Sequence, residues 1–154
     1  MERALVVVEA TAATKDLLRE AGELATGVGA ELILVHVTTE DEYADRADAL
    51  AKIPDVDVSY DVTRARDGAG QFARDVGNEV LQGLDVDFRA IGRLGDKVDE
   101  VLAVADEFNC DHLFVTGRQR SPTGKAIFGD RAQRLILNFN GPVTVTTVTE
   151  ETPA

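Results

Sequence analysis

A segment near the end of the chain gathers the residue types that bind phosphate groups. Between Thr116 and Arg131 the sequence holds three glycines and four cations, namely Gly117, Gly124, Gly129, Arg118, Arg120, Lys125 and Arg131. Glycines let backbone amides approach an anion, a helix N-terminus adds aligned N–H groups, and cations offset phosphate charge. The segment therefore predicts an anion site. The alternative interpretation is a solvated loop whose cations pair with the many carboxylates of the chain.

The elements that must position this segment follow from the hydrophobic pattern. Unbroken or alternating apolar runs predict five strands, over residues 4–8, 31–37, 86–91, 112–116 and 142–148. Helical spacing predicts helices that end near Val28 and lie over residues 70–84, 96–108 and 131–138, with a short helix near 41–51 and an extended piece around 56–62. Strands that alternate with helices indicate an α/β fold built on an open, doubly wound parallel sheet.

In such a sheet the ligand crevice forms beyond the carboxyl ends of the strands, where the strand order reverses. The residues after strands one and four are therefore the place to look, and they include Glu9 and the glycine segment. Other phosphate motifs are incomplete. A receiver domain needs an acidic cluster after strand one, where this chain has Glu9 alone. A flavodoxin needs a glycine in the turn at residues 9–14, which contains none. The Gly-Lys pair at Gly124 lacks the spacing of a Walker A motif.

Composition limits the classes of function. The chain has 154 residues with 28 acidic and 16 basic side chains, a formal charge of −12, so a nucleic-acid partner is not expected. The apolar runs are too short for a membrane span and no signal peptide is visible, so we expect a cytoplasmic protein. We expect one domain over residues 1–149 and a flexible tail over 150–154. The acidic excess favours a halophilic origin, with an ordinary acidic protein as the alternative.

With these features in view, the sequence resembles the universal stress protein family over nearly its whole length. The resemblance rests on the VVVE turn at Glu9, the ELILVHV second strand, the turn containing Gly92, and the glycine segment with its closing Gly-Pro-Val strand. It implies a Rossmann-like, adenine nucleotide alpha hydrolase-like fold with strand order 3-2-1-4-5. In the family a glycine loop holds the phosphates of ATP or AMP, and residues after strands one and two meet the base and ribose.

Carried over to this chain, the resemblance implies nucleotide contacts by Val8, Glu9, Val37, Thr116, Gly117 and Gly129, with cations from the glycine segment beside them. Three departures stand out. Arg120 replaces the second glycine of the family loop, the loop is one residue short, and Asp130 replaces a hydroxyl residue. Asp130 with Gln133 predicts a capping box for the last helix. Its carboxylate would repel a phosphate unless the cations, or a bridging Mg²⁺, compensated.

The sequence therefore predicts a stress-response regulatory domain with ATP or AMP, with Mg²⁺, as candidate ligands. The first alternative is an interaction module whose pocket is closed by Asp130 and Glu9, and the second is a slow metal-dependent ATPase that would hold its metal through Asp130 or Glu9. Catalysis beyond slow ATP hydrolysis is not expected. The resemblance also implies a homodimer that pairs through the strand at 142–148. Cys110, without a basic neighbour in sequence, is expected to be buried and unreactive.

Overall fold

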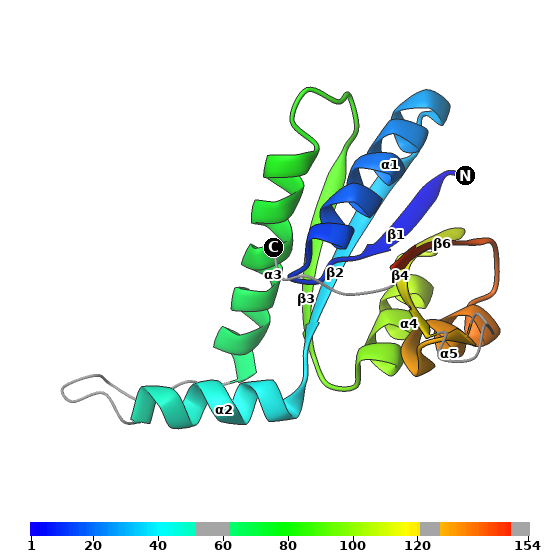
Figure 1. Ribbon diagram of the computed structural model, residues 1–154. Coiled ribbons are helices and arrows are strands. Elements are labelled where there is room, and N and C mark those ends of the chain that lie inside the picture. Colours follow the sequence, from blue (N-terminus) through cyan, green and yellow to red (C-terminus); the bar gives the residue numbers. More distant parts are fainter. Residues whose placement is uncertain (52–61, 121–126, 149–154) are drawn as a thin grey trace.

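The computed structural model describes residues 1–51, 62–120 and 127–148 (Figure 1). Its strands are β1 (Arg3–Val7), β2 (Glu31–Thr38), β3 (Phe88–Leu94), β4 (His112–Arg120), β5 (Ile127–Phe128) and β6 (Val143–Val148). Its helices are α1 (Ala12–Val28), α2 (Glu40–Ala51), α3 (Val62–Val80), α4 (Lys97–Glu107) and α5 (Asp130–Asn138). None of the described helices is long and apolar enough to cross a membrane.

The strands form a mainly parallel sheet in which β3, β2, β1, β4 and β6 lie side by side in that order. This arrangement confirms the predicted fold class and strand order, with β6 as the fifth parallel strand. The two-residue β5 runs antiparallel to the end of β4. The order reverses between β1 and β4, so the carboxyl ends of these two strands open the crevice that a doubly wound sheet offers to a ligand.

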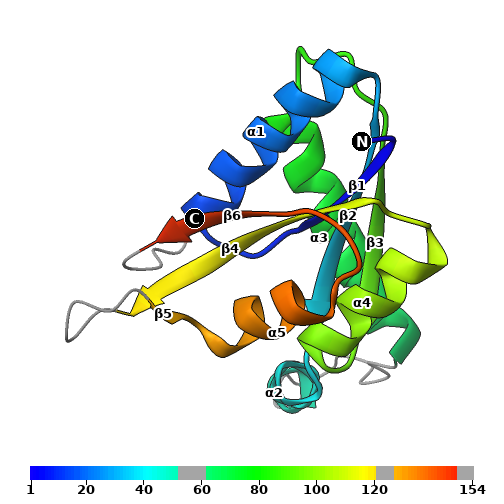
Figure 2. The same cartoon turned by 90° about the vertical axis from the view of Figure 1, so that its right-hand side faces the viewer.

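Helices cover both faces of the sheet because its central strands are apolar on both sides. Ala4 and Val6 of β1 belong to the core cluster that includes residues of α1 and α3, whereas Leu5 belongs to the cluster that includes residues of α4 and α5. Figures 1 and 2 show these two helical layers on opposite faces of the sheet. The helix α2 lies apart from both layers, beyond the carboxyl end of β2 (Figure 1). It therefore stands beside the crevice instead of contributing to the core.

Two predicted boundaries were wrong for a physical reason that the structure shows. The strand β4 continues past Thr116 to Arg120, because Gly117 and Arg118 still pair with Thr147 and Val148 of β6. Gly117 and Arg118 are therefore strand residues and do not belong to a loop after the strand. In α3 the helix begins at Val62, inside the piece predicted as extended; residues 56–61 of that piece lie outside the described residues.

The first turns of α3 escaped prediction because their buried face is made of small residues. Ala65, Ala69 and Ala73 are buried against the sheet, where a search for large apolar side chains finds no pattern. Small residues let the helix lie close to β3. A Cβ built on Gly92 would stand 2.1 Å from the carbonyl oxygen of Arg66, so only glycine fits there. Gly92 thus lies within β3 and not in a turn after it.

The predicted capping box at the start of α5 was also wrong. The N-cap residue is Gly129, which has extended backbone and makes no side-chain capping bond, and Asp130 is the first residue of the helix. Because Asp130 already lies within the first turn, its carboxylate does not take the capping position. A carboxylate in the first turn still interacts favourably with the helix dipole. Asp130 also lines the cavity described below.

Candidate functional site

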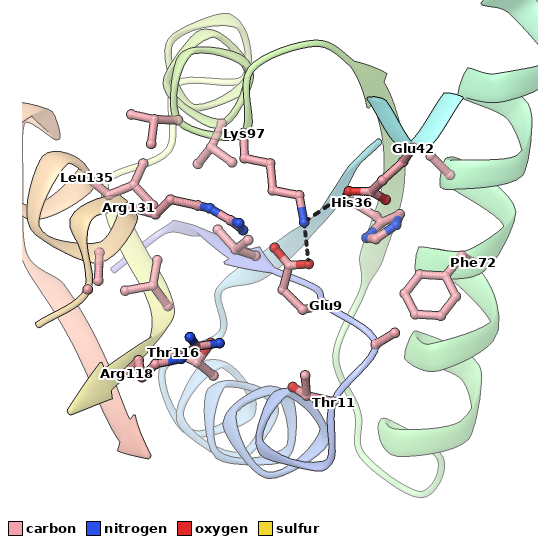
Figure 3. A pocket seen from close by; sticks show the side chains of 18 of the residues that line it. Glu9, Thr11, His36, Glu42, Phe72, Lys97, Thr116, Arg118, Arg131 and Leu135 are labelled. Atoms are coloured by element: carbon pink, nitrogen blue, oxygen red, sulfur yellow. Dashed lines mark hydrogen bonds and ion pairs between the residues drawn. The ribbon is translucent and has the colours of Figure 1, made fainter. Parts of the chain in front are cut away.

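A cavity of about 650 Å³ lies at the carboxyl ends of β1 and β4, where the strand order reverses (Figure 3). Its polar lining comes from the turn after β1, from β2, from α2, from the start of α4, and from β4 and α5. The polar and aromatic side chains among the lining residues are Glu9, Thr11, His36, Glu42, Arg46, Phe72, Lys97, Thr116, Arg118, Asp130 and Arg131. The volume falls within the range of small-molecule sites.

The turn between β1 and α1 is held by hydroxyl groups. Thr11 is the N-cap of α1, and its Oγ1 accepts a hydrogen bond from the backbone N–H of Thr14 at 3.2 Å. The backbone N–H of Glu9 donates in turn to Oγ1 of the buried Thr14 at 3.1 Å. These bonds determine the path of the chain after β1 and place the Glu9 side chain over the cavity.

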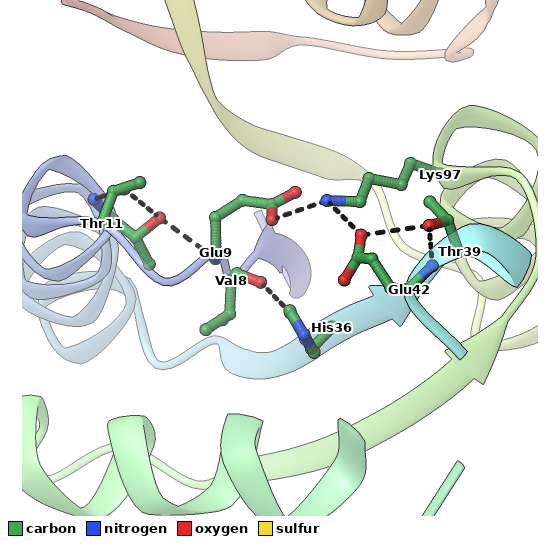
Figure 4. A network of polar contacts seen from close by, with 8 residues as sticks. Val8, Glu9, Thr11, His36, Thr39, Glu42 and Lys97 are labelled. Carbon is green, nitrogen blue, oxygen red and sulfur yellow. Dashed lines mark hydrogen bonds and ion pairs between the residues drawn. The ribbon is translucent and has the colours of Figure 1, made fainter. Parts of the chain in front are cut away.

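An ion-pair network joins the turn after β1 to the first turns of α2 and α4 (Figure 4). The Nζ of Lys97 lies 3.1 Å from Oε2 of Glu9 and 3.5 Å from Oε1 of Glu42. The hydroxyl of Thr39 donates to the same Oε1 of Glu42 and accepts from the Glu42 backbone N–H, both at 3.2 Å. Only 16% of the Lys97 side chain is exposed. The ammonium group of Lys97 therefore offsets the charges of two carboxylates that lie close together at a partly buried position.

The position of Lys97 follows from the start of α4. Asp96 is the N-cap of this helix and accepts hydrogen bonds from the backbone N–H groups of Val98 and Asp99. The bond from Asp99 is the main reason why the pKa of Asp96 is lowered. Gly95, with φ of 146°, turns the chain out of β3 and donates its N–H to the carbonyl of Thr38. The turn therefore brings the first residue of α4 over the ends of β1 and β2.

Two rings form one end of the cavity. His36 of β2 and Phe72 of α3 have ring centroids 4.5 Å apart and tilted planes. The Nδ1 of His36 lies 2.7 Å from the carbonyl oxygen of Val8, and since a carbonyl only accepts, Nδ1 carries the proton. In the neutral ring Nε2 is then an acceptor. This end of the cavity therefore offers aromatic surface, and an acceptor, to a flat heterocycle.

The other end of the cavity is cationic. Arg118 on β4 and Arg131 on α5 both line it, and Figure 3 shows the Arg131 guanidinium reaching toward Glu9 and Lys97. The backbone N–H of Gly129 donates to the carbonyl of Arg118 at 3.0 Å and holds the start of α5 against β4. Asp130 contributes a carboxylate at the same end. The two arginines at this end can thus attract an anion, which the carboxylate of Asp130 would repel.

The structure brings most of the predicted site residues together. Glu9, Thr116, Arg118, Gly129, Asp130 and Arg131 all line the cavity. Val8, Val37 and Gly117 are buried and are not among the lining residues; the contribution of Val8 is its carbonyl oxygen, which receives His36. Lys125 and the side chain of Arg120 lie outside the described residues.

Sequence reasoning missed His36, Glu42, Arg46, Phe72 and Lys97 as site residues. The search was confined to the turns after strands one and four, yet side chains that follow strands two and three reach the same crevice. One signal was available. The chain has four lysines, and Lys97 is the one at the start of a helix that directly follows a strand. His36 lies within β2 and only 8% of it is exposed, yet it also lines the cavity.

Comparisons with solved structures agree with this fold. The hypothetical protein MJ0577 is 17% identical with a TM-score of 0.69, and the alignment covers 97% of each chain. A universal stress protein in complex with cAMP is 14% identical with a TM-score of 0.61, covering 95% of this chain and 96% of that one. A universal stress protein from Archaeoglobus fulgidus in complex with dAMP is 18% identical with a TM-score of 0.51, covering 94% and 97%.

At these identities the likeness establishes the fold alone. No curated protein matches the chain. The model of the universal stress protein family matches residues 1–147, which include every strand that lines the crevice. The chain belongs to the universal stress protein family.

Proposed function

We propose that this chain is a regulatory domain that binds an adenine nucleotide, ATP or AMP, in the cavity between β1 and β4. The observation that carries the proposal is the division of the cavity into an aromatic end at His36 and Phe72 and a cationic end at Arg118 and Arg131. A nucleotide has the same division, because its base is flat and weakly polar while its phosphate is anionic. Two structures with the same fold hold cAMP and dAMP, which supports this ligand class.

The start of α5 supports the orientation of the ligand. Helix N-termini present backbone N–H groups to anions, and the guanidinium of Arg131 adds a planar donor that suits phosphate oxygens. Phosphate at this end places the base toward Phe72. Glu9 and Lys97 then lie between the two ends, where a ribose or the edge of a base would meet an ion pair instead of an isolated charge.

Titration calorimetry with AMP and ATP, with and without Mg²⁺, tests the proposal in dilute buffer and in molar KCl. We expect saturable heat, and we expect Arg131→Gln to weaken binding about tenfold or more because a charge-assisted hydrogen bond to phosphate is lost. Arg134→Gln is the matched control, since Arg134 lies one turn along the same helix beside Asp99 and is not a lining residue. Equal effects of the two variants would contradict the proposed orientation.

An absence of heat with every nucleotide would favour the interaction-module alternative, in which Asp130 and Glu9 close the cavity to ligands. The slow ATPase alternative requires phosphate release that depends on Mg²⁺ and on a carboxylate that could hold it, of which Asp130 and Glu9 line the cavity. Release unchanged by Asp130→Ala would argue against metal binding by that residue.

We also propose a homodimer formed through β6. This strand pairs with β4 on one side, and no described strand pairs with its other edge. An open edge of apolar and threonine side chains is a ready surface for a second copy of the chain. Thr147 is exposed, and Thr147→Asp would place a negative charge on each copy within the proposed contact. Light scattering should then show a dimer for the parent protein and a monomer for the variant.

A further inference from the structure

The charges that line the cavity are nearly balanced, and this balance bears on the number of phosphates that a ligand can carry. Among the described lining residues there are four cations and three carboxylates, namely Arg46, Lys97, Arg118, Arg131, Glu9, Glu42 and Asp130. Lys97 contacts both Glu9 and Glu42. Protein carboxylates therefore already balance the charge of Lys97, and little of it is left for a ligand.

Asp130 differs from the other two carboxylates. Within the described part of the chain its side chain takes part in no ion pair and caps no helix, although it lines the cavity beside Gly129 and Arg131. It lies in the first turn of α5, at the end of the cavity that is suited to an anion. A first phosphate at this end meets two arginines and one carboxylate, whereas each further phosphate adds negative charge without a further described cation there.

We infer that Asp130 selects against nucleotides with several phosphates, so that in the absence of a divalent cation this site takes a nucleoside monophosphate or cyclic monophosphate in preference to a triphosphate. The inference rests on the proposed function and narrows it to one ligand class. The charge of a phosphate chain grows with its length, and two like charges 4 to 8 Å apart repel appreciably at a protein surface. Each added phosphate should therefore weaken binding by about tenfold.

The helix does not depend on this carboxylate. Gly129 is the N-cap without a side-chain bond, and the N–H of Gln133 bonds to the carbonyl of Gly129 at 3.1 Å. Asn at position 130 has nearly the shape of Asp and carries no charge. Asp130→Asn should consequently fold, because it loses only the interaction with the helix dipole, and its main effect should be on the electrostatics of the cavity.

The experiment measures dissociation constants of adenosine, AMP, ADP and ATP by titration calorimetry in EDTA, for the parent protein, Asp130→Asn and Asp85→Asn. Asp85 is exposed and precedes β3, at the opposite end of the sheet, so its variant has the same net charge without the local change. We expect the parent to bind AMP more tightly than ATP. In Asp130→Asn the affinity for ATP should rise about tenfold or more, adenosine should bind unchanged, and Asp85→Asn should match the parent.

The outcomes separate the inference from the proposed function. ATP binding to the parent at least as tightly as AMP, or a ratio of ATP to AMP affinity that Asp130→Asn leaves unchanged, would overturn the inference while nucleotide binding itself stands. Failure of every nucleotide to bind both the parent and Asp130→Asn would overturn the two together. Binding that emerges only in Asp130→Asn would support the inference, because the carboxylate would then be the group that excludes phosphate.

Discussion

The ammonium nitrogen of Lys97 lies 3.1 Å from Oε2 of Glu9, and this contact joins the first residue of α4 to the turn that follows β1. The same nitrogen reaches Glu42 of α2 at 3.5 Å. The helix α2 lies outside both helical layers (Figure 1), and the bridge ties it to the crevice. Lys97 therefore helps to hold the wall of the cavity that Glu42 and Arg46 form.

Lys97→Met should lower the free energy of unfolding by about 1–3 kcal/mol, because two partly buried carboxylates would be left to face each other without their cation. Hydrogen exchange at the amides of α2 should also become faster. The matched control is Lys15→Met, which removes an ion pair to Glu79 of 3.0 Å whose side chains are 41% and 61% exposed. An exposed pair contributes about 0–1 kcal/mol. Urea unfolding curves of the two variants check the difference.

If Lys97→Met and Lys15→Met cost the same, the bridge contributes no more than a surface pair. A further comparison uses Lys97→Met combined with Glu9→Gln. Removing one of the two facing charges should recover part of the loss, since the repulsion between Glu9 and Glu42 is then gone. No recovery would indicate that the loss came from packing of the Lys97 methylene groups.

Gly92→Ala should destabilise the protein by about 3 kcal/mol or more, since the added Cβ would stand 2.1 Å from the Arg66 carbonyl oxygen and 2.3 Å from the Gly70 nitrogen. Both neighbours are backbone atoms and cannot rotate away. Gly27→Ala is the control, because its Cβ would meet nothing within 4 Å in the exposed last turn of α1. That variant should stabilise by about 0.5 kcal/mol through higher helix propensity. Thermal unfolding distinguishes the two.

The close contact at Gly92 also explains what could be predicted from the sequence and what could not. The strands β1 and β2 were predicted almost to the residue, because a strand buried on both faces is a continuous apolar run, as in Leu32–Val35. The alanine face of α3 has no such signature. Its burial depends on a glycine about twenty positions away in sequence, and only the assembled sheet brings the two together.

The site residues also divide into those that could be predicted from the sequence and those that could not. Glu9 and Arg118 lie after the ends of the predicted strands 4–8 and 112–116, and Arg131 begins the predicted last helix, so their common place at the crevice could be predicted from the topology. Glu42 belongs to a polar helix that has little periodicity and whose position depends on Thr39 and Lys97. Contacts between polar side chains leave no period in a sequence. The ion-pair network was therefore beyond prediction, whereas the crevice was not.

His112 should make stability depend on pH in the mildly acidic range. Burial holds the pKa of His112 below its ordinary value, although Asp111 acts in the opposite direction. Its Nε2 lies 2.8 Å from the hydroxyl of Thr144. Below about pH 6.5 the His112 ring of the unfolded chain is protonated, whereas the ring in the native protein is still neutral. The free energy of unfolding should therefore fall as the pH decreases from about 6.5 to the lowered native pKa.

Urea unfolding at a series of pH values from 7 to 5 measures this slope for the parent and for His112→Gln, which retains a hydrogen-bonding group but does not titrate. The slope should be smaller in the variant. An identical slope would show that other groups produce the pH dependence. Proton NMR of the His112 ring would report the native pKa directly, and the same titration in urea would supply the unfolded value.

Cys110 should be nearly inert to thiol reagents in the native protein at pH 8. Burial raises the pKa of its thiol to about 11, although Arg3 acts in the opposite direction, and 9% of the residue is exposed. The thiolate is the reactive form, so both its scarcity and its burial slow the reaction. Since the chain has one cysteine, all colour released from a disulfide reagent reports on this residue. We expect labelling at least about a hundredfold slower than in urea.

The raised pKa of Cys110 also predicts the direction of a change at high pH. Above about pH 8.5 the unfolded chain loses the thiol proton, whereas the native protein retains it until about pH 11. The contribution of this group to stability is thus complete below pH 8.5 and is lost as the pH rises toward 11. The difference in unfolding free energy between the parent and Cys110→Ala should shrink over this interval, because alanine does not titrate. A difference that stays constant with pH would show that Cys110 ionises alike in both states.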